Sequence, residues 1–228
     1  MLKDSLDIYG DDLHEECGVF GIFGVDDAPN LTYYGLHALQ HRGQEACGIS
    51  AFDGEKLNTV KGEGLVTEVF NQQKLDKLKG RIAIGHVRYA TTGGGGLSNV
   101  QPFSFNHHTG DFALAHNGVL WNDYELRHER QLLHTKIETD SYIAVQLIEQ
   151  QKALHPQSLK NMAEELEGSF CFTVLDKERS RISTMLRDNG YFNFTINNIL
   201  YEVDTTVGDY RADVTVVVRQ NLSGYNEL

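Results

Sequence analysis

Short apolar runs, separated by polar or glycine-rich segments, make up most of this chain. Runs of this length predict strands, and they are CGVFGIFGV (17–25), ACGISAF (46–52), IAIGHVRYA (82–90), FALAHNGVL (112–120) and GSFCFTVLD (168–176). The strands at 17–25 and 82–90 are predicted to be buried. A turn at Asp53-Gly54 and a further short strand around Thr59–Lys61 predict a hairpin after ACGISAF.

Helical spacing of apolar residues is found between these runs. Asn30 is the expected N-cap of a helix that ends near Arg42 and carries Leu31, Tyr34, Leu36, Ala38 and Leu39. Further helices are predicted at residues 65–79, 123–133 and 140–154. Strands mixed with helices in hairpin order predict an α+β fold of sheet layers with helices packed against them.

The pattern changes after residue 178. It predicts a short helix, a break at Gly190-Tyr191 and two alternating strands. The residues expected to share a face are Tyr201 and Val203 in the first strand, and Val214, Val216 and Val218 in the second.

Charge and composition narrow the function classes. The 228 residues include 20 Lys and Arg against 32 Asp and Glu, a net charge of -12, which argues against nucleic acid and anionic membranes as partners. No apolar run approaches the roughly 18 residues of a membrane-spanning helix, and acidic residues 1–16 lack the apolar core of a secretory signal. We therefore expect a cytoplasmic protein. No metal or cofactor is expected, because the histidines lack ligand spacing and the run Gly93–Gly96 is not a phosphate loop.

Three cysteines are present, and a disulfide framework is not expected in this setting. Cys47 and Cys171 lie within apolar runs and are predicted to be core residues. Cys17 begins a strand, so it is either another core residue or an accessible nucleophile. Removal of residues 1–16 would make it N-terminal, and its own α-amine could then serve as the general base for its thiol.

Four other residues are candidates for a site, each with a structural alternative. Arg88 at a strand end could bind a substrate carboxylate or form a structural ion pair. Asn117-Gly118 could supply N–H donors to an oxyanion or form a hairpin turn. Asp140 opens a predicted helix, where it could cap the helix or bind a substrate ammonium group.

Several motifs in a fixed order resemble class II glutamine amidotransferase domains, most of all the glutaminase half of amidophosphoribosyltransferases. They are CGVFGIFG, LHALQHRGQEACGI, GHVRYATTG, NVQPF, LAHNG and ETDS, and the resemblance covers about residues 10–178. It implies an N-terminal-nucleophile fold, with two stacked, mainly antiparallel sheets between layers of helices. It also implies cleavage of the glutamine side-chain amide through a cysteinyl thioester, which yields glutamate and ammonia.

The resemblance assigns a role to each matching residue. Cys17 matches the nucleophile and Arg88 the ligand of the glutamine α-carboxylate, while Asp140 matches the ligand of the α-ammonium group. Asn117 and the Gly118 N–H match the oxyanion hole. Arg42 resembles the arginine that braces the catalytic turn, and the acidic residues before Cys17 resemble a propeptide that is removed.

Residues 179–228 depart from the family. Their predicted helix, ending in LRDNGYF (186–192), and the strand pair after it resemble a fragment of POTRA domains from outer-membrane assembly factors. We therefore predict a leader at residues 1–16, a glutaminase domain at 17–178 and a divergent tail at 179–228. No acidic phosphoribosyl-pyrophosphate motif is found, so the expected ammonia acceptor is a separate synthase subunit. The alternatives are an amidophosphoribosyltransferase-like fragment, a glutamine-binding regulatory module without turnover, and a tail that acts as an unrelated interaction module.

Overall fold

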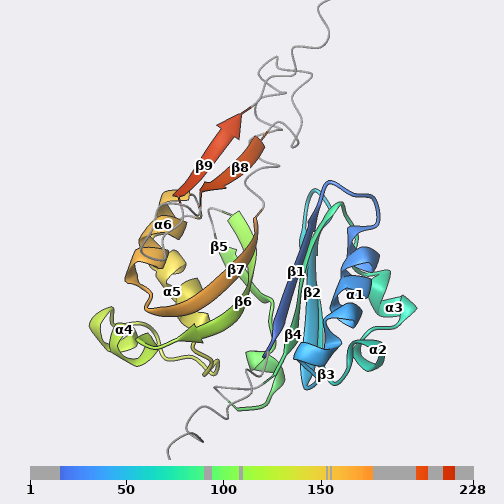
Figure 1. Ribbon diagram of the computed structural model, residues 1–228, viewed down its shortest axis with the longest axis horizontal. Helices are drawn as coiled ribbons and strands as arrows, with labels where there is room; N and C mark the ends of the chain where they lie inside the picture. Colours follow the sequence, from blue (N-terminus) through green and yellow to red (C-terminus); the bar gives the residue numbers. More distant parts are fainter. Residues whose placement is uncertain are drawn as a thin grey trace, which may run out of the picture.

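Two antiparallel sheets face each other at the centre of the molecule, and helices cover their outer faces (Figure 1). The computed structural model describes residues 16–89, 94–107, 110–152, 154, 156–176, 199–204 and 213–218. No helix in the described part of the chain is long and apolar enough to cross a membrane. The side of each sheet that looks at the other sheet is called the inter-sheet face below.

The first sheet has four strands and three helices on its outer face (Figure 1). Its strand order is β1 (Gly18–Phe23), β4 (Ile82–Arg88), β2 (Ala46–Phe52) and β3 (Leu57–Glu63). The helices are α1 (Ala28–Ala38), α2 (Val66–Val69) and α3 (Gln72–Leu75), and a 3₁₀ turn, η2 (Gln40–Arg42), follows α1. Every residue of β2 is buried, because this strand lies between two neighbours and both of its faces are covered.

The second sheet has three described strands, in the order β5 (Phe103–His107), β6 (Gly110–Leu120) and β7 (Gly168–Asp176). A 3₁₀ turn, η3 (Leu97–Asn99), precedes β5, and the helices of this half are α4 (Asp123–Glu129), α5 (Tyr142–Gln150) and α6 (Pro156–Glu165). A core of aromatic and aliphatic side chains joins the outer face of this sheet to α5 and α6.

Successive side chains of a strand point to opposite faces of the sheet, and this alternation decides which of them lie on the inter-sheet face. Ile84 of β4 packs there with Ala113 and Ala115 of β6. Because side chains two residues apart in a strand share a face, His86 and Arg88 lie on the same side as Ile84. By the same rule, Asn117 lies on the same side as Ala115.

The strands predicted from the apolar runs are confirmed, but the predicted burial of residues 17–25 is wrong for most of β1, in which Gly18 alone is buried. β1, β2, β4, β6 and β7 all fall on those runs, and β7 has the predicted bounds Gly168–Asp176. The hairpin of β2 and β3 is also confirmed, with Ala46 opposite Glu63 and Phe52 opposite Leu57. Strand β5 and helix α6 were not predicted from the sequence.

The prediction for the first helix is wrong in its cap, and only part of the apolar set that it named is buried. Asp27 is the N-cap residue, and the Asn30 side-chain amide donates to its carboxylate at 2.7 Å. Tyr34 is 67% exposed, whereas Thr32 and Leu36 are buried. Small residues determine which side of the helix faces the sheet, because a Cβ on Gly35 would lie 2.6 Å from the Phe20 ring. The helix therefore approaches the sheet along its small-residue side.

The helix predicted at residues 65–79 is divided into α2 and α3. Phe70 and Asn71 between them have extended backbone angles. The Asn71 side chain accepts a hydrogen bond from the Lys74 N–H at 3.0 Å, which caps α3. A polar residue with a strong capping preference thus interrupts the helical pattern.

The two strands predicted in the tail are confirmed as an antiparallel pair. β8 (Ile199–Asp204) pairs with β9 (Asp213–Val218), with Tyr201 opposite Val216 and Val203 opposite Val214. The pair forms a separate two-stranded sheet at the end of the molecule that carries α6 (Figure 1). The short helix predicted before it lies outside the described residues.

Candidate active site

Cys17 lies directly before β1, at the end of the sheet where β4 finishes. Gly18 pairs with Val87, so the next position along each strand places Cys17 beside Arg88. The Cys17 sulfur lies 3.3 Å from both the backbone N and the backbone O of Tyr89. Cys17 itself has a left-handed φ of 61°, which is uncommon for a side chain with a Cβ. The thiol is therefore held at a strand end in a conformation that the surrounding contacts impose.

Arg42 and Cys17 hold each other through two hydrogen bonds. The Cys17 N–H donates to the Arg42 carbonyl at 2.8 Å, and the Arg42 Nε donates to the Cys17 carbonyl at 2.7 Å. Gly43 makes this approach possible, because a Cβ there would lie 2.6 Å from the Val87 carbonyl carbon. The HRG segment thus holds the backbone of Cys17 from both sides.

The electrostatic surroundings of Cys17 involve two of the predicted site residues. Burial raises the pKa of the Cys17 thiol above its ordinary value. The Tyr89 N–H and the positive charge of Arg88 lower this pKa, whereas the negative charge of Asp140 raises it further. Arg88 and Asp140 therefore both lie close enough to the thiol to influence its ionisation.

Arg88 is almost completely buried at the end of β4. Its Nη2 donates to the Gly94 carbonyl at 2.7 Å, so the arginine also contacts the chain beyond β4. A buried guanidinium group on the inter-sheet face is suited to bidentate recognition of a carboxylate.

Asn117 and Gly118 lie near the end of β6 on the facing sheet. They pair with Cys171 and Phe170 of β7, so this Asn-Gly is part of a strand and the hairpin-turn alternative is wrong. Gly118 has a φ of 142°, and a Cβ there would lie 2.0 Å from the Ser169 carbonyl oxygen. Only glycine fits this position, because both the backbone angle and the close contact exclude a side chain.

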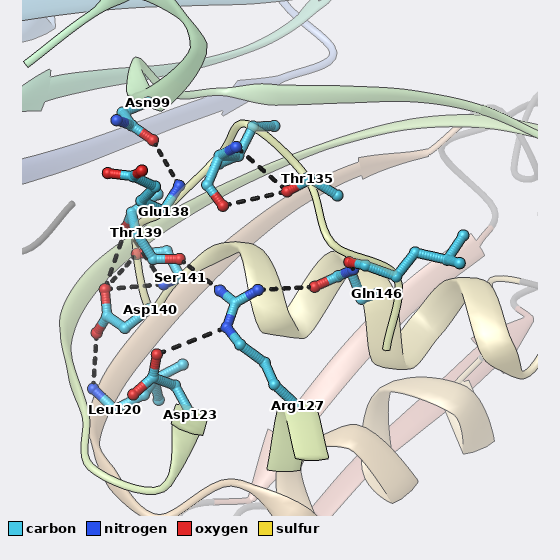
Figure 2. Close-up of polar contacts among 12 residues, drawn as sticks. Asn99, Leu120, Asp123, Arg127, Thr135, Glu138, Thr139, Asp140, Ser141 and Gln146 are labelled. Atoms are coloured by element: carbon cyan, nitrogen blue, oxygen red, sulfur yellow. Dashed lines mark hydrogen bonds and ion pairs between the residues drawn. The ribbon is translucent and has the colours of Figure 1, made fainter. Parts of the chain in front are cut away.

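Asp140 is buried between the end of β6 and the start of α5 (Figure 2). Its Oδ2 accepts from the Leu120 N–H at 2.8 Å, and its Oδ1 accepts from the Ser141 N–H at 2.8 Å. The helix begins at Tyr142, and its N-cap residue is Ser141. The carboxylate thus joins β6 to the segment before α5 instead of capping the helix.

Neighbouring side chains fix the segment that carries Asp140 (Figure 2). Arg127 donates to the Thr139 carbonyl and to the Gln146 side chain, both at 3.1 Å. The Glu138 N–H donates to the Asn99 side chain at 3.0 Å. Contacts from α4 and η3 therefore converge on residues 138–141, and α5 holds the Arg127 side chain in place.

A buried polar network next to the candidate residues was not predicted from the sequence. His86 Nε2 lies 3.0 Å from the His116 carbonyl oxygen and so links the two sheets. The His116 N–H donates to Gln101 Oε1 at 2.7 Å, and His116 Nδ1 lies 2.7 Å from Ser141 Oγ. The signal available in the sequence was the presence of polar residues within apolar strands.

Both histidines of this network are uncharged near neutral pH. Burial lowers the pKa of His86 to about 3, and burial lowers that of His116 to about 4, although Asp140 raises the latter. His116 also stacks on Phe172, with 4.6 Å between ring centres. The network is therefore made of neutral hydrogen-bonding groups, apart from Asp140.

The two other cysteines differ from each other. Cys47 is buried in β2, as predicted, and burial raises its pKa to about 12. The prediction that Cys171 is a core residue is wrong, because Cys171 is exposed. It lies on β7, an edge strand of the described second sheet, opposite Asn117 of β6. Within the described residues, no group of three or more His, Cys, Asp or Glu could hold a metal ion.

Comparison with known proteins decides the family. Residues 86–198, which include the strands and loops carrying Arg88, Asn117, Gly118 and Asp140, match the model of the glutamine amidotransferase domain. The chain contains a class II glutamine amidotransferase domain. The match continues past residue 178 and ends before β8, so the predicted boundary at residue 178 stays a prediction.

Relatives of this amidotransferase domain are found in bacteria and plants. The chain is 49% identical over 167 residues to the amidophosphoribosyltransferase of Bacillus subtilis, covering 72% of this chain and 35% of that protein. It is 42% identical over 186 residues to the chloroplastic amidophosphoribosyltransferase 2 of Arabidopsis thaliana, covering 78% of this chain and 33% of that protein. The chain thus spans about a third of the length of these relatives.

Solved structures give the same result for the fold. A structure described as the allosteric regulatory enzyme of purine biosynthesis matches 70% of this chain and 35% of its own, with a TM-score of 0.65 and 47% identity. The B. subtilis glutamine phosphoribosylpyrophosphate amidotransferase, complexed with ADP and GMP, matches the same shares with a TM-score of 0.64 and 46% identity. The predicted N-terminal-nucleophile fold of the amidotransferase domain is confirmed.

Proposed function

We propose that residues 17–178 form a glutaminase that hydrolyses the side-chain amide of glutamine to glutamate and ammonia. The observation that carries the proposal is the position of the Cys17 thiol, which is influenced by the charges of both Arg88 and Asp140. A cation and an anion next to a nucleophile match the α-carboxylate and α-ammonium groups of an amino-acid substrate.

Each step of the proposed reaction is assigned to a named residue. The α-amine of Cys17 takes the thiol proton, and the thiolate attacks the amide carbon of bound glutamine. The oxyanion that forms accepts hydrogen bonds from the Asn117 side-chain amide and the Gly118 N–H. The protonated amine then gives its proton to the leaving ammonia, and a thioester remains. Water attacks this thioester, which releases glutamate and returns the proton to the thiolate.

Removal of residues 1–16 is a necessary part of this proposal. In the unprocessed chain, the nitrogen of Cys17 is a peptide N–H that donates to the Arg42 carbonyl at 2.8 Å. A peptide nitrogen is not a base, whereas a free α-amine has a pKa of about 8. Arg42 would hold this amine close to the sulfur, because it binds both the nitrogen and the carbonyl of Cys17.

The unprocessed chain has a second candidate function as a glutamine-binding module without turnover. Its Cys17 nitrogen is blocked, and burial raises the pKa of its thiol, so the reactive thiolate is scarce. The groups proposed to bind the substrate backbone, Arg88 and Asp140, do not depend on cleavage of the leader.

Intact mass and N-terminal sequencing of the purified protein, together with a glutamate-release assay, test both functions. A chain that begins at Cys17 and releases glutamate from glutamine supports the glutaminase. A full-length chain that binds glutamine and releases no glutamate supports the binding module. A full-length chain with rapid turnover would refute the role of the α-amine.

The use of the ammonia is a further part of the proposal. We assign the acceptor to a separate synthase subunit and place the protein in the cytoplasm. Copurification of a synthase that aminates its substrate only in the presence of glutamine and this chain would support that assignment.

A further inference from the structure

We propose that Ser141 and His116 are positioning residues, which orient the Asp140 carboxylate toward the α-ammonium group of glutamine. This inference rests on the proposed glutaminase function and extends it to two residues that do not contact the substrate. Three observations carry it: the hydrogen bonds around Ser141, the direction of those bonds, and the attachment of His116 to both sheets.

Ser141 connects Asp140 to His116. Its N–H donates to Asp140 Oδ1 at 2.8 Å, and its Oγ lies 3.3 Å from the same oxygen. Its Oγ also lies 2.7 Å from His116 Nδ1. All three residues are almost completely buried, so water does not compete for these bonds.

Gln101 fixes the direction of the hydrogen bonds. Its Oε1 accepts from the backbone N–H of His116 at 2.7 Å, so its Nε2 is the atom that faces Ser141 Oγ, at 3.3 Å. The Ser141 hydroxyl must accept from this amide, because an amide nitrogen only donates. Its single proton is then directed to either Asp140 or His116.

His116 decides between these two directions. Its Nε2 is buried and has no partner among the described residues. A buried N–H without an acceptor costs more than an unused nitrogen lone pair, so the proton of the neutral ring belongs on Nδ1. His116 then donates to Ser141 Oγ, and the Ser141 hydroxyl donates to Asp140.

His116 is itself held at its backbone by both halves of the molecule. Its N–H donates to Gln101, and its carbonyl accepts from His86 Nε2 at 3.0 Å across the inter-sheet face. Asn117, the proposed oxyanion donor, is the next residue in β6. The same residue, His116, therefore fixes the strand of the oxyanion donor and, through Ser141, the ligand of the ammonium group.

The bond from Ser141 leaves Asp140 with a defined orientation. Oδ1 accepts from Ser141 and from the Thr139 hydroxyl at 3.1 Å, while Oδ2 accepts from the Leu120 N–H (Figure 2). Loss of the Ser141 hydroxyl removes one of these donors and the connection to His116. We expect weaker binding of the ammonium group and unchanged recognition of the rest of glutamine.

Steady-state kinetics of the processed protein with two substrates separates positioning from general structural damage. The substrates are L-glutamine and 4-carbamoylbutanoate, which has the same amide and carboxylate but lacks the α-ammonium group. For Ser141→Ala, we expect at least a tenfold loss in kcat/KM with glutamine, mainly through KM, and less than a twofold change with 4-carbamoylbutanoate. Ser50→Ala is the matched control, because Ser50 is also buried and bonds the Thr59 hydroxyl at 2.8 Å in the other sheet.

Variants of His116 test the second residue in the same assay. His116→Asn retains an N–H near the place of Nδ1 and should keep most of the preference for glutamine. His116→Phe retains stacking on Phe172 but removes the donor, so it should lose the preference as Ser141→Ala does. An equal loss with both substrates, or no loss in Ser141→Ala, would overturn the inference.

An NMR measurement of the His116 tautomer needs no activity. Long-range ¹H–¹⁵N spectra at neutral pH should show a proton on Nδ1 of His116. A proton on Nε2 would overturn the proposed direction of the bonds. If the proton is on Nδ1 but the parent neither binds nor hydrolyses glutamine, the glutaminase proposal fails, and the network is structural only.

Discussion

At the scale of single residues, Cys17 has two unusual properties that follow from its position before β1. Its backbone is left-handed and its thiol is half-buried. Arg42 holds this conformation, because it binds both the N–H and the carbonyl of Cys17. Such a conformation is retained only where surrounding contacts stabilise it. The sequence could suggest Cys17 as a nucleophile, but it could not reveal this strain, which depends on contacts 25 residues away.

Replacement of Cys17 by alanine should abolish glutamate release and leave glutamine binding largely intact. The nucleophile is lost, whereas the proposed ligands Arg88 and Asp140 remain. Glutamate release and isothermal titration with glutamine measure the two effects. Turnover at the parent rate in this variant would mean that Cys47 or another group is the nucleophile.

Replacement of Gly118 by alanine should destabilise the protein more than replacement of Gly54. Both glycines have positive φ, so alanine adds backbone strain of about 1 kcal/mol at each. At Gly118 the new Cβ would also meet the Ser169 carbonyl oxygen at 2.0 Å, whereas nothing lies within 4 Å at Gly54. Urea unfolding of the two variants measures the difference, and equal stability would contradict the close contact.

At the scale of elements, the apolar runs predicted five strands but not β5, and they did not separate the short helices α2 and α3. Strand β2 is an apolar run that is buried throughout, whereas among the described side chains of β7 only Leu175 is buried, although its sequence is similarly apolar. Of the apolar residues named for helix α1, Leu36 is buried but Tyr34 is exposed, because the contact of this helix with the sheet depends on Gly35 and on the Phe20 ring. Helix α6 was not predicted because most of its residues are polar, although Leu159 and Met162 are three residues apart, which is helical spacing.

The buried histidines of β4 and β6 should make the stability of the fold depend on pH. Burial lowers the pKa of His86 from 6.5 to about 3 and that of His116 to about 4. Below pH 6.5 the unfolded chain binds protons that the folded protein does not, so stability is complete above this pH and falls as pH decreases toward 4. At pH 5 the loss is roughly 2 kcal/mol for each histidine.

Urea unfolding between pH 7.5 and pH 5 measures this effect. His86→Gln is the informative variant, because its side-chain N–H can still donate to the His116 carbonyl but does not titrate. We expect a smaller decrease of the free energy of unfolding with pH in this variant than in the parent. The same decrease in both proteins would show that His86 is not buried in its neutral form.

At the scale of the whole molecule, the candidate site lies where two sheets with different sequence ranges meet. Cys17 and Arg88 come from the first sheet, whereas Asn117 belongs to the second and Asp140 follows it in the chain. The sequence indicated the members of the site through the order of their motifs. It could not indicate Gln101 or Ser141 as their neighbours, because those contacts exist only after the segments before β5 and α5 have packed against β6.

The pair β8–β9 should be dispensable for the glutaminase. It forms a sheet of its own and lies beyond residue 198, where the family match ends. Deletion of residues 199–228 should leave the melting temperature within a few degrees of the parent and leave glutamate release within twofold. Loss of folding would show that this pair stabilises the second sheet or α6.

Covalent labelling of the active protein tests the central claim most directly, namely that Cys17 is the N-terminal nucleophile of a glutaminase. A glutamine analogue with a chloromethyl ketone in place of the side-chain amide alkylates a thiol that attacks this position. Peptide mass spectrometry should find one adduct per chain, on a peptide that begins at Cys17, and excess glutamine should prevent it. An adduct at Cys47 or Cys171, or an adduct-free chain that still loses its activity, would contradict the account.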